Sequence, residues 1–261
     1  MSEFVHLQVK SHYSLRSGLP TPKDIVDAAH KKGLKAVAMT DKNSFFGIIK
    51  FYNYAISKGV KPICGVDFDI ESNLKGLTKG LLLAKNKKGL EKLFSLSTKS
   101  YLQANKGIKI NENEILALRD DIIFILPSDN FSVYKSTDIQ EGKDVIATID
   151  ALKNTFSSNL YLGVTNYSDD AYDENSSNLI KFCSEKNIHA VALNDVHFIK
   201  QSDFLNHQAK VAINTGTHLR SEMENPSCSK EQYFKTFDEM KSNHKEDLLL
   251  NTFEIAKQCN V

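Results

Sequence analysis

The chain has 261 residues, of which 41% are hydrophobic and 25% are charged, and its formal net charge is +1. This composition is typical of a globular protein with a large core, and the near-zero charge argues against a surface that attracts nucleic acid through bulk electrostatics. The longest apolar runs, such as 122–126, are too short to span a bilayer. The first residues lack the pattern of a secretion signal. We therefore expect neither membrane insertion nor export.

Cys64, Cys183, Cys228 and Cys259 are widely spaced, so no two of them form a close pair. This spacing argues against a zinc ribbon and against a CxxC redox motif. Reduced thiols in a cytoplasmic protein are the expected state.

Short apolar runs alternate with helical stretches along the chain. We expect strands near 4–10, 35–39, 61–68, 81–85, 122–126, 159–164 and 189–193. Thr21-Pro22 predicts the start of a helix that ends near Gly33, and Gly59 ends the next helix in the same way. This alternation predicts a parallel sheet covered by helices, and seven strands favour a closed or nearly closed barrel.

The later part of the chain is predicted to be helical. The acidic, serine-rich stretch from Asn166 to Ser177 is predicted to be a loop. From Gln201 onward no strand pattern is evident, and short helices end with Leu248 to Lys257. We therefore predict one domain over residues 1–261, with a barrel over about 1–200 and a helical tail over about 201–261.

Polar residues gather on the predicted strands between Phe4 and Asp69. Apolar and polar residues alternate from Phe4 to Lys10, so His6, Gln8 and Lys10 are predicted to share one face. The next two predicted strands end in polar residues, namely Asp41, Lys42 and Asp67. Barrels of alternating strands and helices keep their chemistry where strand ends converge. These side chains therefore predict a polar pocket.

Four motifs carry a resemblance to a known family: Phe4 to Ser14, Thr40 to Tyr52, Gly59 to Gly65, and Leu193 to Phe198. Together with residues 254–261, they resemble the PHP (polymerase and histidinol phosphatase) domain of the bacterial DNA polymerase III α subunit. The resemblance covers essentially the whole chain. It implies an α/β fold, a distorted seven-stranded (βα) barrel of PHP type with a short helical C-terminal tail.

The resemblance also implies a pocket that has lost most of its metal ligands. PHP sites bind divalent metals through histidines and carboxylates, which suit zinc, manganese and iron. The family's ligand positions fall on residues that depart from the pattern, on Gln8, Lys10, Ser17, Lys42, Asp67 and Lys79, while Asp195 and His197 keep it. A further ligand expected around Ser128 to Asp129 has no clear counterpart. We expect no catalytic residue and no bound metal in this chain, the alternative being a residual single-metal site at Asp195 and His197.

Lysines at ligand positions oppose metal binding. Two unit charges 4 Å apart interact by roughly 4 kcal/mol at an effective dielectric constant near 20, and a dication doubles this repulsion. We therefore predict that Lys10, Lys42 or both form ion pairs with Asp41, Asp67 or Asp195.

The resemblance implies a catalytically silent amino-terminal domain of a polymerase that supports the palm and thumb of the α subunit. It also implies docking of the proofreading exonuclease subunit (ε). The full-length protein would be a DNA-directed DNA polymerase, a nucleotidyltransferase that meets DNA within the holoenzyme and uses divalent metal in its polymerase domain. One alternative is a metal-dependent phosphoesterase or 3′–5′ exonuclease, and another is an enzyme resembling histidinol phosphatase. The lost ligands count against both.

Overall fold

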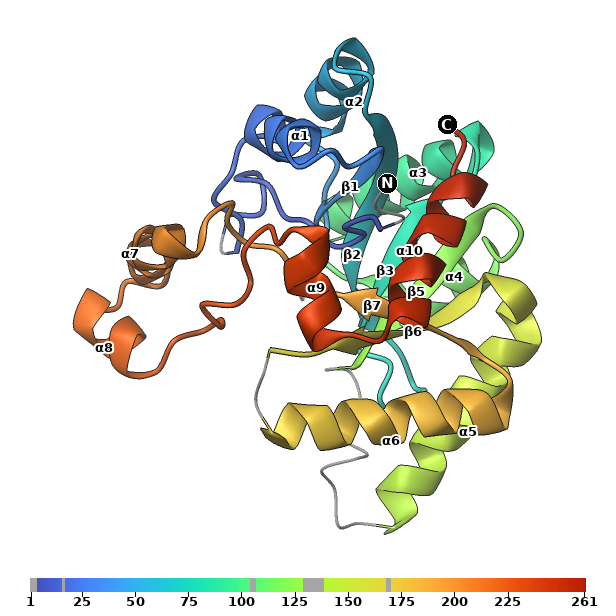
Figure 1. Ribbon diagram of the computed structural model, residues 1–261. Coiled ribbons are helices and arrows are strands. Elements are labelled where there is room, and N and C mark those ends of the chain that lie inside the picture. The colour runs from blue at the N-terminus through green and yellow to red at the C-terminus, as the bar shows by residue number, and fades with distance from the viewer. Residues whose placement is uncertain (1–3, 16, 104–106, 129–138, 168–169) are drawn as a thin grey trace.

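The structure is a computed structural model that describes residues 4–15, 17–103, 107–128, 139–167 and 170–261. A curled seven-stranded sheet lies at its centre, and helices surround the sheet (Figure 1). The strands are β1 (Ala36–Lys42), β2 (Lys61–Glu71), β3 (Lys79–Ala84), β4 (Ile110–Asn111), β5 (Ile122–Pro127), β6 (Leu160–Thr165) and β7 (His189–Leu193). The α-helices are α1 (Pro22–Lys31), α2 (Ile48–Ser57), α3 (Lys87–Leu102), α4 (Glu112–Leu116), α5 (Ile139–Phe156), α6 (Asp170–Lys186), α7 (Phe204–Thr215), α8 (Leu219–Glu224), α9 (Phe237–Asn243) and α10 (Glu246–Gln258).

The sheet order is β1-β2-β3-β5-β6-β7, with the short β4 paired to β2. The pairs β1–β2, β5–β6 and β6–β7 are parallel, as predicted, but β3 runs antiparallel to both β2 and β5. Residues 72–78 connect β2 to β3, and this link is too short for a helical crossover, so the chain turns back on itself. The expectation of an all-parallel sheet is therefore wrong at β3.

Residues 4–10 fill the gap between β1 and the segment after β7 without forming a regular strand, contrary to the prediction. Their hydrogen bonds join both sides: Thr40 N donates to Val9 O (2.8 Å), and Lys10 N donates to Val196 O (2.9 Å). The side-chain alternation also breaks. Val5 and Leu7 pack in the barrel interior, whereas Val9 joins the outer core. The irregular segment thus completes the barrel wall.

His6 consequently does not share a face with Gln8 and Lys10. Its ring packs between Phe4 and Phe234, with ring centroids 4.8 and 4.3 Å away. Its Nε2 lies 2.9 Å from the carbonyl oxygen of Lys235. Burial is the main cause that lowers the pKa of His6 to about 4, so this imidazole is a neutral packing group.

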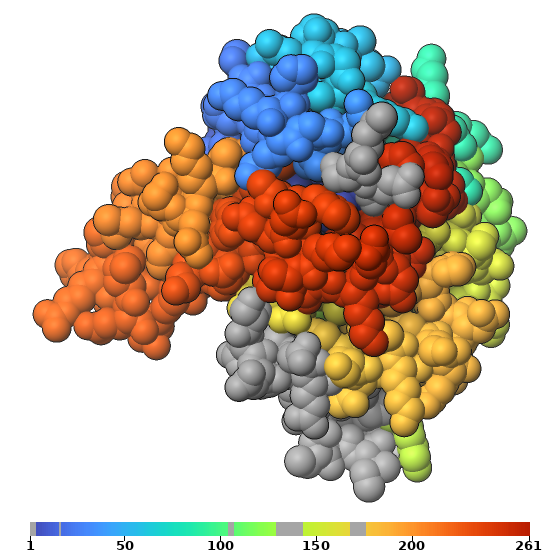
Figure 2. All heavy atoms as spheres, viewed as in Figure 1, coloured from blue at the N-terminus to red at the C-terminus, as the bar shows by residue number. Residues whose placement is uncertain are grey.

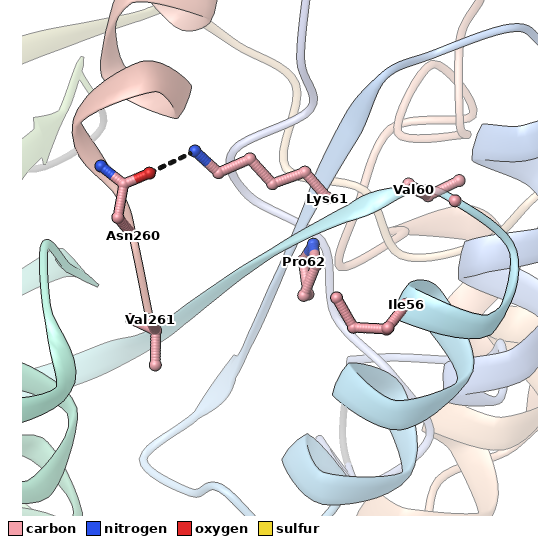
Figure 3. Close-up of a pocket in the computed structure, with 7 residues that line it drawn as sticks. Ile56, Val60, Lys61, Pro62, Asn260 and Val261 are labelled. Atoms are coloured by element: carbon pink, nitrogen blue, oxygen red, sulfur yellow. Dashed lines mark hydrogen bonds between the residues drawn. The ribbon is translucent and has the colours of Figure 1, made fainter.

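The two ends of the barrel differ in character. Apolar side chains of α10, such as Ile255 and Ala256, join the interior core and close the end where β1 and β2 begin. Lys61 Nζ at the start of β2 donates to Ala256 O (2.8 Å) and to Asn260 Oδ1 (2.9 Å; Figure 3). A cavity of about 550 Å³ lies here, lined mainly by aliphatic groups such as Ile56 and Val60. The polar residues gather at the opposite end.

The helix ends follow the sequence signals. Thr21 and Asp24 form a capping box at the start of α1, and Thr236 and Glu239 form one at the start of α9. Gly33, just after α1, has φ of 70°, a backbone conformation that favours glycine. The predicted loop from Asn166 to Ser177 is wrong from Asp170 onward, where α6 begins; residues 166–167 lie in no helix or strand, and 168–169 are outside the described residues. In the described part of the chain, no helix is long and apolar enough to cross a membrane.

The predicted helical tail is present and has two parts. Helices α7 and α8 project from the barrel as an arm, whereas α9 and α10 return to pack on it (Figures 1 and 2). Gly216 ends α7 with φ of 70°. The loop between α8 and α9 runs back along the barrel, and Phe198 and Tyr233 form an isolated parallel bridge there.

Candidate functional site

The side chain of Lys10 lies between two carboxylates from distant parts of the chain. Its Nζ is 2.7 Å from Asp67 Oδ2 on β2 and 2.7 Å from Asp195 Oδ1 in the segment after β7. The Lys10 side chain is 4% exposed, so this ammonium group is removed from solvent. A buried amine in this position satisfies two carboxylates at once, and the ion pairing predicted for Lys10 is confirmed.

The remaining oxygens of the two carboxylates also have partners. Asp67 Oδ1 lies 3.3 Å from Lys42 Nζ, and Asp67 Oδ2 also accepts from Gln8 Nε2 (3.2 Å). Asp195 Oδ2 lies 3.1 Å from Nε2 of His197. Every carboxylate oxygen of Asp67 and Asp195 therefore contacts a donor on another side chain. We call Gln8, Lys10, Lys42, Asp67, Asp195 and His197 the ion-pair cluster.

Charge complementarity outweighs burial in this cluster. Burial alone would lower the pKa of Lys10, but the carboxylates of Asp195 and Asp67 raise it above its ordinary value. Burial alone would raise the pKa of Asp67, but Lys10 and Lys42 lower it. The pKa of Asp195 is lowered against burial by Lys10 and His197. The amine is therefore charged and both carboxylates are ionised near neutral pH.

These residues do not fit a cluster of divalent metals. Such metals need free carboxylate oxygens and neutral imidazoles, yet the oxygens of Asp67 and Asp195 already accept from amine, amide or imidazole groups. The Lys10 ammonium occupies the space between them and would repel a cation. The chemistry that this arrangement performs is internal charge neutralisation.

Asp41, the third carboxylate considered as a partner for the lysines, accepts hydrogen bonds in a turn instead. It accepts hydrogen bonds from Ser11 N (2.7 Å), Ser11 Oγ (2.7 Å) and Ser14 Oγ (2.6 Å). The amines of Lys10 and Lys42 pair with Asp67, and Lys10 also pairs with Asp195, so the predicted ion pairing uses two of the three carboxylates named for it. Asp41 thus fixes the turn that follows Lys10.

The other predicted pocket residues lie around the cluster. Lys42 makes a second ion pair, with Asp69 Oδ1 at 2.7 Å. Lys79 begins β3 and, with Gln8, Asp195 and His197, lines a cavity of about 580 Å³. Ser128 lines the same cavity, while Asp129 lies outside the described residues. Ser17 lies in the turn before α1, where its carbonyl oxygen is 2.8 Å from Nε2 of His207.

A second group of potential metal ligands shares His197 with the ion-pair cluster. Potential ligand atoms of His197, His207 and Cys228 lie within 4.8 Å of one another, and all three residues are buried. This group could hold a metal ion. Sequence reasoning missed His207 and Cys228 because they come from α7 and from the loop between α8 and α9, at a spacing that matches no metal motif. The ion pair of Asp69 with Lys42 was also missed, because Asp69 lies two residues after Asp67 on β2, beyond the position that the family pattern marks.

Comparison with known proteins identifies relatives of this chain. The family model described as "PHP domain" matches residues 6–165. DNA polymerase III subunit alpha of Buchnera aphidicola (subsp. Schizaphis graminum) is 32% identical over 272 residues, covering 100% of this chain and 23% of that protein. The same subunit of Escherichia coli K12 is 31% identical over 269 residues, with the same coverage. This chain therefore spans about a quarter of the length of these relatives.

A solved structure shares the fold. The crystal structure of a protein described as a metal-dependent phosphoesterase from Bifidobacterium adolescentis superposes with a TM-score of 0.51 at 12% identity. The match covers 74% of this chain and 87% of that one. At this identity the likeness shows the fold alone.

Replacing Lys10 by methionine should destabilise the protein strongly. Lys10→Met keeps most of the side-chain volume but leaves Asp67 and Asp195 facing each other without their shared amine. Breaking a buried pair in this way costs about 3–5 kcal/mol of unfolding free energy. Urea denaturation at pH 7 measures this loss. The matched control is Lys23→Met, which removes an exposed pair with Asp27 and should cost less than about 1 kcal/mol.

The stability gap between the wild type and Lys10→Met should narrow in acid. Asp67 and Asp195 have lowered pKa values in the folded wild type, so their contribution is present above the unfolded pKa near 4 and is lost as pH falls through the folded pKa. In the variant the buried carboxylates lack the amine and bind protons more readily on folding. Denaturation at pH 7 and at pH 3.5 checks this expectation, and a gap of equal size at both pH values would contradict it.

Proposed function

This chain belongs to the PHP domain family, and we propose that it is the amino-terminal PHP domain of a DNA polymerase III α subunit, with a metal pocket replaced by internal ion pairs. The observation that carries the proposal is the Lys10 amine, which lies 2.7 Å from both Asp67 and Asp195. Identity of about 31% over the whole chain to α subunits supports the assignment to the polymerase branch of the family.

In this proposal the domain has no hydrolytic activity of its own. Gln8, Lys10 and Lys42 donate hydrogen bonds and positive charge to Asp67 and Asp195, so these two carboxylates do not hold a metal cluster that would activate water. DNA-directed DNA polymerisation belongs to the remainder of the α subunit, its palm and thumb, with divalent metal bound there. The protein acts in the cytoplasm and meets DNA within the holoenzyme. The domain contributes a rigid support to that assembly.

The second part of the proposal is that the domain docks the proofreading exonuclease subunit ε. Large apolar side chains are exposed near the start of α2 and the end of α3, namely Phe46, Ile49, Tyr101 and Leu102. The rings of Phe46 and Tyr101 are 5.4 Å apart, so they form one surface. Exposed apolar surface of this kind is typical of partner contacts. We call these four residues the aromatic patch.

The metal-dependent phosphoesterase or exonuclease alternative predicts turnover that depends on Asp67 and Asp195. We expect none: with Mn²⁺ or Zn²⁺ added, the purified chain should hydrolyse p-nitrophenyl phosphate and a single-stranded 3′ end at the rate of the double variant Asp67→Asn/Asp195→Asn. The rate of the double variant measures hydrolysis by contaminating enzymes. Metal-stimulated turnover that disappears in the double variant would restore the enzymatic alternative, including an enzyme that resembles histidinol phosphatase.

Docking of ε is tested by titration calorimetry with the purified exonuclease subunit. We expect a complex with the wild-type chain and binding at least about tenfold weaker with Phe46→Ser, since truncation of a buried aromatic anchor costs more than about 1.4 kcal/mol. Ile213→Ser on α7 is the control, because Ile213 is also exposed but lies on the projecting arm. Absence of a complex, or equal losses in both variants, would contradict docking at the aromatic patch.

A further inference from the structure

His197, His207 and Cys228 converge at the base of the arm formed by α7 and α8. His197 follows β7, His207 lies on α7, and Cys228 lies in the loop between α8 and α9. Cys228 Sγ is 3.3 Å from Nδ1 of His207. In a tetrahedral zinc site with Zn–S near 2.3 Å and Zn–N near 2.0 Å, this sulfur–nitrogen separation is about 3.5 Å. The pair is therefore already at the spacing of two ligands.

Each imidazole is oriented through its other nitrogen. His207 Nε2 lies 2.8 Å from Ser17 O, a carbonyl that can only accept, so Nε2 carries the proton and Nδ1 presents its lone pair towards Cys228. His197 Nε2 lies 3.1 Å from the ionised carboxylate of Asp195, which leaves the lone pair on Nδ1. Metal-binding histidines characteristically donate their second nitrogen to a carboxylate or a backbone carbonyl, as these two do.

One buried nitrogen in this group, Nδ1 of His197, has a lone pair and no hydrogen-bond partner among the described residues. The side chain of His197 is buried, with only 8% of the residue exposed. A hydrogen bond between Cys228 and His207 explains their own contact but leaves this nitrogen unsatisfied. Buried polar atoms normally have a partner, and a cation supplies one.

A role for Cys228 as a nucleophile explains the three side chains less well than metal binding does. Burial is the main cause that raises the pKa of the Cys228 thiol to about 12, so without a cation the thiol stays protonated and unreactive. A bound metal ion would stabilise the thiolate directly.

We propose that His197, His207 and Cys228 bind a single zinc ion, with a water molecule as the fourth ligand. Two imidazoles and one thiolate form a donor set that zinc accepts. The cavity of about 580 Å³ lined by His197 and Cys228 provides the route for the ion and the space for the water. The ion joins the barrel, α7 and the returning loop, and so fastens the arm at its base (Figures 1 and 2).

Asp195 links the zinc site to the ion-pair cluster. One of its oxygens contacts Lys10 and the other contacts His197. The zinc site nevertheless goes beyond the proposed polymerase role, because two of its three ligands, His207 and Cys228, lie outside the positions carried over from the family, and zinc binding is measurable without any activity.

Cobalt provides the direct test, because Co²⁺ occupies zinc sites and a cobalt–thiolate bond gives a charge-transfer band in the near ultraviolet. We expect the purified chain to bind one Co²⁺ with this band, and Zn²⁺ to displace it. Cys228→Ser should abolish the band, and His207→Ala should weaken the affinity by more than about 100-fold, beyond the 10- to 100-fold loss typical of second-shell changes. Cys183→Ser, which changes a buried cysteine on α6, should leave the band intact.

Circular dichroism establishes that each variant is folded. If Cys228→Ser does not fold, native mass spectrometry of the wild-type chain and of His207→Ala replaces it, and one Zn²⁺ ion should bind to the wild-type chain but not to His207→Ala at the same zinc concentration. No cobalt band at saturating Co²⁺, a band that persists in Cys228→Ser, or equal zinc binding by the wild-type chain and His207→Ala would overturn the zinc site. None of these outcomes tests docking of ε or hydrolysis. The zinc site and the proposed function can therefore be contradicted independently of each other.

Discussion

A single buried ammonium group holds together three parts of the barrel wall. Lys10 comes from the irregular segment that fills the gap in the sheet, Asp67 from β2, and Asp195 from the segment that follows β7. Burying one charge costs several kcal/mol unless opposite charges compensate it, and here two carboxylates do so at 2.7 Å. The cluster thus makes the polar end of the barrel a cross-link between these three segments. The rest of the site, including the orientation of His197, follows from where Asp195 is held.

Much of the fold was predictable because its signals are local. Thr21-Pro22 and Gly33 mark the two ends of α1 through neighbouring residues alone, and the structure has an N-cap at Thr21 and a positive φ at Gly33. The apolar runs at β5, β6 and β7 also lie where expected. The direction of β3 was not predictable from its own residues, because an apolar strand reads the same in either direction and only the short link from β2 reverses it. The strand predicted at 4–10 was wrong for a related reason. This segment bonds both to β1 and to the segment after β7, and its side-chain alternation breaks after Leu7.

Some features of the candidate site could also be predicted from the sequence, and others could not. The pairing of Lys10 with Asp67 and Asp195 could be predicted, since opposite charges at converging strand ends have few other partners. The role of Asp41 could not, because its hydrogen bonds depend on the turn from Ser11 to Ser14 folding back over β1. His207 and Cys228 were invisible as a group, because only the return of the chain after α8 brings them together.

The complete satisfaction of Asp67 and Asp195 limits how the pocket can change. A metal centre at these carboxylates would need ligands in place of the amines of Lys10 and Lys42. The first substitution, however, would remove charge compensation before any metal could bind, and the cost of a broken buried pair is a large fraction of a domain's total stability. A substitution at Lys10 would therefore be removed for instability, whatever the pocket does. A change of chemistry at these carboxylates needs several simultaneous substitutions, whereas the surface around the pocket can vary one residue at a time.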